Sequence, residues 1–198
     1  DNGVNIPAMK KGAIYADSDD SGVKGMTENP DFHGLYQRRH AGNEEVNYLA
    51  SYRFMIKIGN EYGKGKTYTS VSKADIPGLT DTSYSRIRSM MANLQKKSFF
   101  KNYSNANKKA FVFGVAMHTS TDTFAHSTYR YYNGTWYSIT HAINEKKGQY
   151  KKNEADNSKF VPERFDMAYR AERNTLYRYQ GKRSDVAVCH DFHAANDP

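Results

Sequence analysis

Histidine and carboxylate side chains recur at one spacing between residues 110 and 145. His118, Asp122 and His126 follow one another at steps of four residues, and His141 and Glu145 are separated by the same step. On an α-helix a step of four residues turns about 40° past a full circle, so these side chains share a helix face. Imidazole and carboxylate groups are ligands that zinc prefers. The spacing predicts a zinc site, and we expect two or more ions.

The residues before this motif indicate that its helix is buried. Phe111, Phe113, Val115 and Met117 are all apolar. Buried imidazole and carboxylate groups must be paired with each other or bound to a metal. A hydrogen-bonded network in the core is therefore the alternative to a metal site.

The composition describes one globular domain over residues 1–198. With 38% hydrophobic and 25% charged residues, the chain can bury a core, and no apolar run has the length of a membrane span. The net charge of +8 favours anionic partners such as phosphate esters, acidic lipid headgroups or nucleic acid. The basic residues are dispersed along the chain, so plain solubility is the alternative explanation of the charge.

The elements expected to position the motif are helices, and the predicted class is all-α. Residues 1–43 are rich in Gly, Asp, Asn and Pro and are expected to be mostly loop. Apolar periodicity and capping residues predict helices over 43–62, 82–97, 105–126, 135–147 and 162–179, with a turn at Asn133-Gly134. No alternating strand pattern and no internal repeat competes with this assignment.

Two stretches resemble the ligand-bearing helices of bacterial zinc-dependent phospholipases C of the alpha-toxin-like group. They are GVAMHTSTDTFAHS and HAINEKKGQYKKN. Upstream, GAIYADSDDS and DFHGLYQRRH resemble the loop in which that family places a ligand Asp and then a ligand His. These enzymes share an all-helical fold with zinc-dependent single-strand nucleases. The resemblance covers residues 12–153 in patches.

The resemblance implies two metal clusters and a secreted hydrolase of phospholipid headgroups. The first cluster would be Asp17, His33, His118 and Asp122, and the second would be His126, His141 and Glu145. Asp17 is preferred over Asp19 or Asp20 because it follows the apolar-aromatic run Ile14-Tyr15-Ala16, as the ligand Asp of the resembled family follows a similar run. His33 is preferred over His40 on spacing, and His40 stays an alternative.

The chain departs from this family in three ways. The family has a longer, proline-containing step where Asp122 and His126 are four residues apart. It builds a third site from an N-terminal Trp and a His on its first helix, whereas this chain begins with Asp1, and too few residues precede Asp17 to supply that helix. The family's fold also continues further after its last ligand helix. Near the end of the chain, three residues could replace missing metal ligands, and a solvated tail is the alternative: Cys189, His190 and His193.

If the site is active, zinc would lower the pKa of bound water to about 7, and paired ions would hold the attacking and leaving oxygens of a phosphodiester. Asp122 would orient or bridge the ions, and Asp17 would act as a ligand and as the base. Phospholipid at a peripheral membrane surface is the expected substrate. A single-strand nuclease and a zinc-stabilised binding module without turnover are the alternatives.

Overall fold

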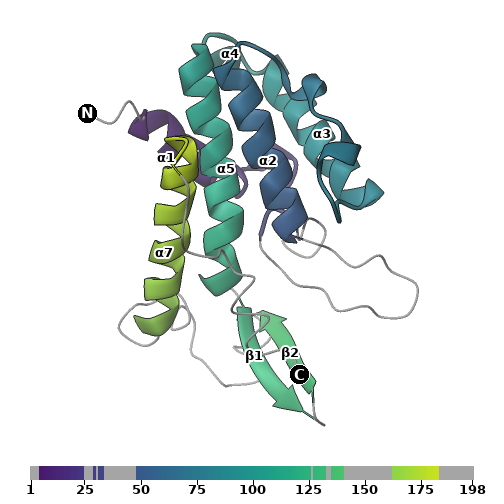
Figure 1. Ribbon diagram of the computed structural model, residues 1–198, viewed down its shortest axis with the longest axis vertical. Helices are drawn as coiled ribbons and strands as arrows, with labels where there is room; N and C mark the ends of the chain where they lie inside the picture. The colour runs from purple at the N-terminus through teal and green to yellow at the C-terminus, as the bar shows by residue number, and fades with distance from the viewer. Residues whose placement is uncertain are drawn as a thin grey trace.

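The computed structural model describes residues 5–24, 29, 31–33, 48–125, 127–132, 135–140 and 162–182. The longer helices are α1 (Ile6–Tyr15), α2 (Tyr48–Gly63), α3 (Asp81–Lys96), α5 (Asn105–Ala125) and α7 (Pro162–Tyr179). A short helix α4 (Ser98–Lys101) and three 3₁₀ turns, η1 (Asp19–Ser21), η2 (Tyr68–Ser70) and η3 (Lys73–Asp75), connect them. Two strands, β1 (Ser127–Tyr132) and β2 (Thr135–Thr140), follow α5 (Figure 1).

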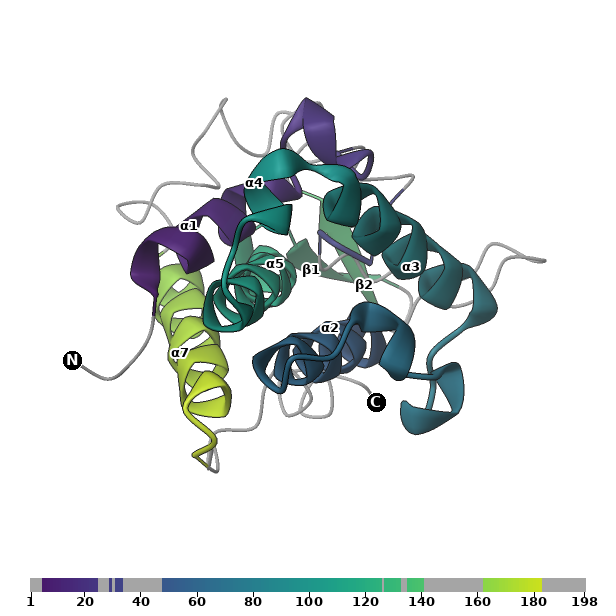
Figure 2. The same ribbon diagram turned by 90° about the horizontal axis from the view of Figure 1, so that it is seen from above.

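Helix α5 is the centre of the fold. Helices α1, α2 and α7 each pack directly against it, and α3 lies beside α2 on the side away from α7 (Figures 1 and 2). A helix surrounded in this way must be apolar on every side. Six residues of one stretch of α5 are fully buried: Ala110, Phe111, Val112, Phe113, Val115 and Ala116.

Two glycines allow α1 to lie directly on the backbone of α5. A Cβ atom added at Gly12 would lie 1.9 Å from the carbonyl oxygen of Phe111, and one added at Gly114 would lie 2.0 Å from that of Met9. No side chain fits at such distances, so only glycine permits this crossing. The contact places the end of α1 beside the second half of α5.

Local capping explains where several helices begin. The Asn5 side chain accepts a hydrogen bond of 2.9 Å from the amide of Ala8, and Pro7 lies in the first turn of α1. Thr80 caps α3 in the same way, accepting a bond of 3.0 Å from the amide of Ser83. Helix α7 begins at Pro162, because proline suits a first helical turn.

The helical class is confirmed, and most of the predicted helices are found. The predicted helix over 162–179 has the bounds of α7, and the one over 82–97 is shifted by one residue in α3. Helices α2 and α5 fill the described parts of the ranges 43–62 and 105–126, while residues 43–47 and 126 lie outside the described residues. None of the described helices is long and apolar enough to cross a membrane.

Two predictions of secondary structure are wrong. Residues 6–15 form α1 rather than loop, so a helix does precede Asp17 despite the short N-terminal segment. Residues 135–140 form β2, which pairs antiparallel with β1, where a helix was expected over 135–147. The two strands are rich in Thr and Tyr, which favour strands, and Asn-Gly between such runs is a strong hairpin signal.

Candidate metal centre

Three segments far apart in the sequence meet at one point beside α5. Asp17 lies two residues after the end of α1, His33 lies in the short segment 31–33, and His118 and Asp122 are about one turn apart on α5. Asp17, His33 and His118 each offer a ligand atom, and these atoms all lie within 4.8 Å of one another. Asp122 is in contact with both histidines.

The ligand atoms of Asp17, His33 and His118 lie close enough together to share one metal ion, and Asp122 contacts both histidines. Asp122 Oδ2 lies 3.0 Å from His118 Nε2 and 3.3 Å from His33 Nδ1, and these two nitrogens are 3.3 Å apart. Asp17 Oδ1 lies 3.6 Å from His118 Nε2 and 3.7 Å from His33 Nδ1. Ligands about 2.0–2.1 Å from a tetrahedral zinc ion are separated by about 3.3–3.4 Å. The donor set and its spacing therefore suit zinc.

Three of the four residues are buried, and the fourth faces solvent. The exposed fractions are 1% for His33, 8% for His118 and 6% for Asp122. The Asp17 side chain is 62% exposed. The cluster is thus embedded on the α5 side and opens to water at Asp17.

The carbonyl of Val23 determines which nitrogen of His33 faces the cluster. His33 Nε2 lies 3.0 Å from the Val23 carbonyl oxygen, which can only accept a hydrogen bond. We therefore assign the proton of the neutral ring to Nε2, which leaves the lone pair of Nδ1 directed at Asp17, His118 and Asp122. A metal-binding histidine needs this tautomer when it coordinates through Nδ1.

The two carboxylates also favour positive charge at His33. Although burial alone would lower it, the pKa of His33 is raised above its usual range by hydrogen bonding to Asp122 and to the Val23 carbonyl and by the charges of Asp122 and Asp17. The same negative field that retains a proton on the imidazole would attract a cation to its place.

The structure brings together the four residues expected in the first cluster. The two acids considered as alternatives to Asp17 form ion pairs with lysines instead. Asp19 Oδ1 lies 2.8 Å from Lys24 Nζ, and Asp20 Oδ1 lies 2.9 Å from Lys97 Nζ. The second cluster stays a prediction, because its members lie outside the described residues: His126, His141 and Glu145. The same holds for the residues that could replace an expected ligand: His40, Cys189, His190 and His193.

Sequence reasoning missed the groups that support the cluster. They are the Val23 carbonyl, the Asp31 carboxylate and the Thr119 hydroxyl. Asp31 could have been identified from the sequence, because an acid two residues before the proposed ligand His33 is a candidate for a residue that supports the metal ligands. A backbone carbonyl leaves no such signal.

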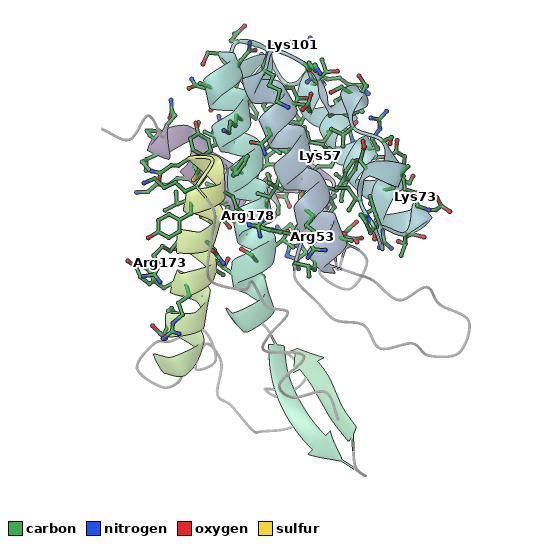
Figure 3. The ribbon with its side chains drawn as sticks, in the orientation of Figure 1. Arg53, Lys57, Lys73, Lys101, Arg173 and Arg178 are labelled. Carbon is green, nitrogen blue, oxygen red and sulfur yellow. The ribbon has the colours of Figure 1, made fainter. Side chains whose placement is uncertain are left out.

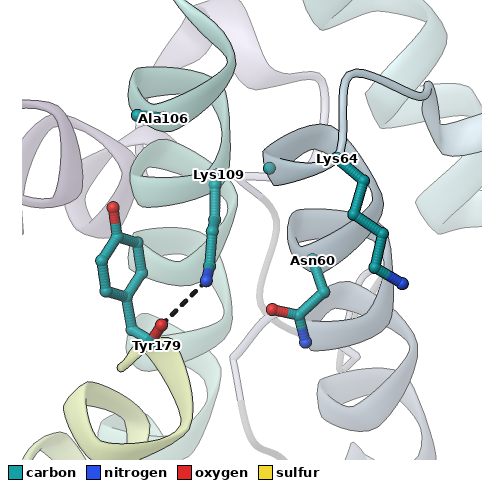
Figure 4. A pocket seen from close by; sticks show the side chains of 6 residues that line it. Asn60, Lys64, Ala106, Lys109 and Tyr179 are labelled. Carbon is teal, nitrogen blue, oxygen red and sulfur yellow. Dashed lines mark hydrogen bonds between the residues drawn. The ribbon is translucent and has the colours of Figure 1, made fainter. Parts of the chain in front are cut away.

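A separate pocket of about 570 Å³ lies between α2, α5 and α7. In Figure 4, Lys109 and Asn60 face each other across it, and Lys109 Nζ donates a hydrogen bond of 2.8 Å to the Tyr179 carbonyl. Burial lowers the pKa of Lys109. Lys109 and His118 are nine positions apart, about two and a half helical turns, so their side chains leave α5 on opposite sides and the pocket is separate from the cluster.

Basic side chains are spread over the described surface. Figure 3 labels examples on α2, η3, α4 and α7: Arg53, Lys57, Lys73, Lys101, Arg173 and Arg178. This distribution gives a diffuse positive field rather than a single binding strip.

No known protein family, characterised protein or solved structure matches this chain.

Proposed function

We propose that this protein is a zinc-dependent hydrolase of phosphodiesters, with phospholipid headgroups as the substrate. The observation that carries the proposal is the group of Asp17, His33 and His118, whose ligand atoms all lie within 4.8 Å of one another, with Asp122 in contact with both histidines. The phospholipid substrate and a secreted location rest on the resemblance to the zinc-dependent phospholipases C.

The exposure of the four residues indicates their different roles. His33, His118 and Asp122 are buried and would hold the ion, and the Val23 carbonyl would keep His33 in the required tautomer. Zinc would supply a lowered pKa of bound water and a positive charge beside the phosphate oxygens. Asp17 would also bind the ion through Oδ1, and because its side chain is largely exposed, its other oxygen, Oδ2, can accept the proton of an attacking water.

Further zinc ions are part of the proposal. Asp122 would also help to hold a second ion, since the expected second cluster begins at His126, four residues further along the sequence. The net charge of +8 would attract a phosphodiester to such a centre. The same charge suits a single-stranded nucleic acid, which makes nuclease activity the second candidate.

The test is an assay of zinc-loaded and chelator-treated protein on three substrates: phosphatidylcholine vesicles, single-stranded DNA and a chromogenic phosphodiester. We expect zinc-dependent release of phosphocholine, and we expect Asp122→Asn to abolish it. Asp75→Asn is the matched control, because Asp75 pairs with Lys57 at 3.1 Å on α2, away from the cluster, and should leave activity unchanged.

Each outcome has a distinct meaning. Cleavage of DNA without cleavage of lipid would favour the nuclease. A protein that binds zinc but hydrolyses none of the three substrates would overturn the hydrolase proposal in favour of a zinc-stabilised binding module. A protein that binds no zinc would overturn both.

A further inference from the structure

Asp31 is a fully buried acid at the start of the segment that holds His33. Its exposed fraction is 0%, and it receives donors from two helices. Ser51 of α2 donates a hydrogen bond of 2.8 Å to Oδ1, and Ser83 of α3 donates to the same oxygen. Arg86 of α3 donates from Nη1 to Oδ2 at 2.9 Å. Three donors thus attach this one carboxylate to α2 and α3.

The next two residues are attached to other parts of the molecule. Phe32 is fully buried, and its carbonyl accepts a hydrogen bond of 3.0 Å from the hydroxyl of Thr119. Thr119 adjoins His118 on α5. His33 is held by the Val23 carbonyl. Three consecutive residues are therefore fixed to α2, α3, α5 and the loop after η1.

Burying a carboxylate to hold a segment in place costs free energy. Removing a charge from water carries a penalty that its partners only partly offset, and an apolar residue could fill the same space without that penalty. What the carboxylate adds is direction, because three hydrogen bonds fix both its position and its orientation. A metal ligand needs such accuracy, since a shift of about 1 Å at the Nδ1 atom of His33 would spoil its bond to the ion.

We propose that Asp31 is a positioning residue for the metal centre. Its bonds to Ser51, Ser83 and Arg86 fix the segment 31–33, so that the Nδ1 atom of His33 reaches the point shared by Asp17, His118 and Asp122. This inference rests on the proposed zinc site. It goes beyond that site by assigning α2 and α3, which supply none of the four ligands, a part in building it.

The test compares zinc affinity with the stability of the zinc-free protein. Asp31→Asn keeps the shape of the side chain but places an amide against Arg86, and Thr119→Val keeps the shape of Thr119 but removes the bond to Phe32. Both variants should bind zinc at least about tenfold more weakly in a chelator competition, as is typical when the groups around metal ligands are changed. Thr119→Ser keeps the hydroxyl and should restore wild-type affinity. The visible spectrum of the cobalt-substituted protein should change in Asp31→Asn.

Tyr52→Phe is the matched control. It removes a buried hydrogen bond of 3.0 Å between the hydroxyls of Tyr52 on α2 and Thr175 on α7, away from the cluster. It should lower the thermal midpoint without changing zinc affinity. If Asp31→Asn does not fold, Arg86→Gln and Thr119→Val decide the question, because Arg86 is partly exposed and its replacement leaves Asp31 with two donors.

Two results would overturn the inference. If the wild-type protein binds zinc and the Asp31, Arg86 and Thr119 variants bind it equally well, Asp31 only stabilises the fold, while the proposed zinc site stands. If the wild-type protein binds no zinc, the proposed function fails and this inference fails with it.

Discussion

The Nε2 atom of His33 and the carbonyl oxygen of Val23 lie 3.0 Å apart, ten residues from each other in the chain. This contact occupies one ring nitrogen and leaves the other for the cluster, where Asp122 Oδ2 is 3.3 Å away. A loop with no regular structure thereby determines the chemistry of a buried imidazole. If the cluster binds zinc as proposed, metal, substitutions and pH should each have a measurable effect on the protein.

Zinc should stabilise the folded protein. An ion that binds only the folded state adds about 2.7 kcal/mol when its free concentration is 100 times its dissociation constant. For a domain of this size that raises the thermal midpoint by about 5–10 °C. Scanning calorimetry before and after chelation measures the shift. Magnesium is the control, because it prefers an octahedron of oxygen ligands and should give little or no shift. Equal midpoints with zinc and with chelator would contradict a zinc site.

Asp17→Asn should weaken zinc binding by more than about 100-fold, because it removes a negatively charged ligand rather than a group of the surrounding shell. Asp19→Asn is the matched control, since Asp19 is two residues away and pairs with Lys24 instead. Titration with a competing chelator measures both variants. A loss of affinity in Asp19→Asn alone would show that the wrong acid had been assigned.

Gly114→Ala should damage both the fold and the metal centre. Its Cβ would overlap the carbonyl oxygen of Met9 and push α1 away from α5, at a cost of about 1–3 kcal/mol in the free energy of unfolding. Because Asp17 follows α1, zinc affinity should fall as well. Urea unfolding and a zinc titration measure the two effects.

Gly63→Ala is the control for that experiment. Its Cβ would lie 2.9 Å from Cδ of Lys109, a flexible side chain that can move aside. Stability should change by less than about 1 kcal/mol, in either direction. If Gly114→Ala were tolerated equally well, the close approach of α1 and α5 would not be a requirement of the fold.

Tyr62 should make the protein sensitive to alkali. Burial raises the pKa of Tyr62 from 10.0 to about 12, since the ionised phenol is disfavoured where it lies in the core. The unfolded chain then loses this proton at lower pH than the folded protein. Stability should be unaffected below pH 10 and should fall as the pH rises from 10 towards 12.

Urea unfolding of the wild-type protein and of Tyr62→Phe between pH 9 and 11.5 measures the effect. The variant lacks this titration, so its stability should fall less steeply with pH, while the remaining tyrosines contribute equally to both proteins. Identical slopes would mean that Tyr62 ionises as easily in the folded protein as in the unfolded one.

Local patterns predicted most of the helices and half of the site. Steps of four residues among His118, Asp122 and His126 indicated a ligand-bearing helix, and His118 and Asp122 do share a face of α5. Pro162 marked the start of α7. Such signals depend on neighbours in the chain, so a single sequence contains them.

Other features of the fold and the site depend on contacts between distant parts of the chain, which the sequence does not specify locally. Gly12 suggested loop, yet it lies inside α1, where it permits contact with Phe111. The bonds of Asp31 to α2 and α3 join residues 20 and 52–55 positions apart, and no local pattern specifies such pairs. The hairpin is a different case, because Asn133-Gly134 carried its signal and was interpreted only as a turn between helices.

The separation of the ligands along the chain has a consequence for biosynthesis. His33 lies 89 residues before Asp122, its partner in the cluster. While the ribosome makes the intervening helices, the first two ligands are already synthesised, but the residues that complete their cluster do not yet exist. If the cluster binds zinc as proposed, the nascent chain should take up the ion only once α5 has emerged and α1 has docked on it.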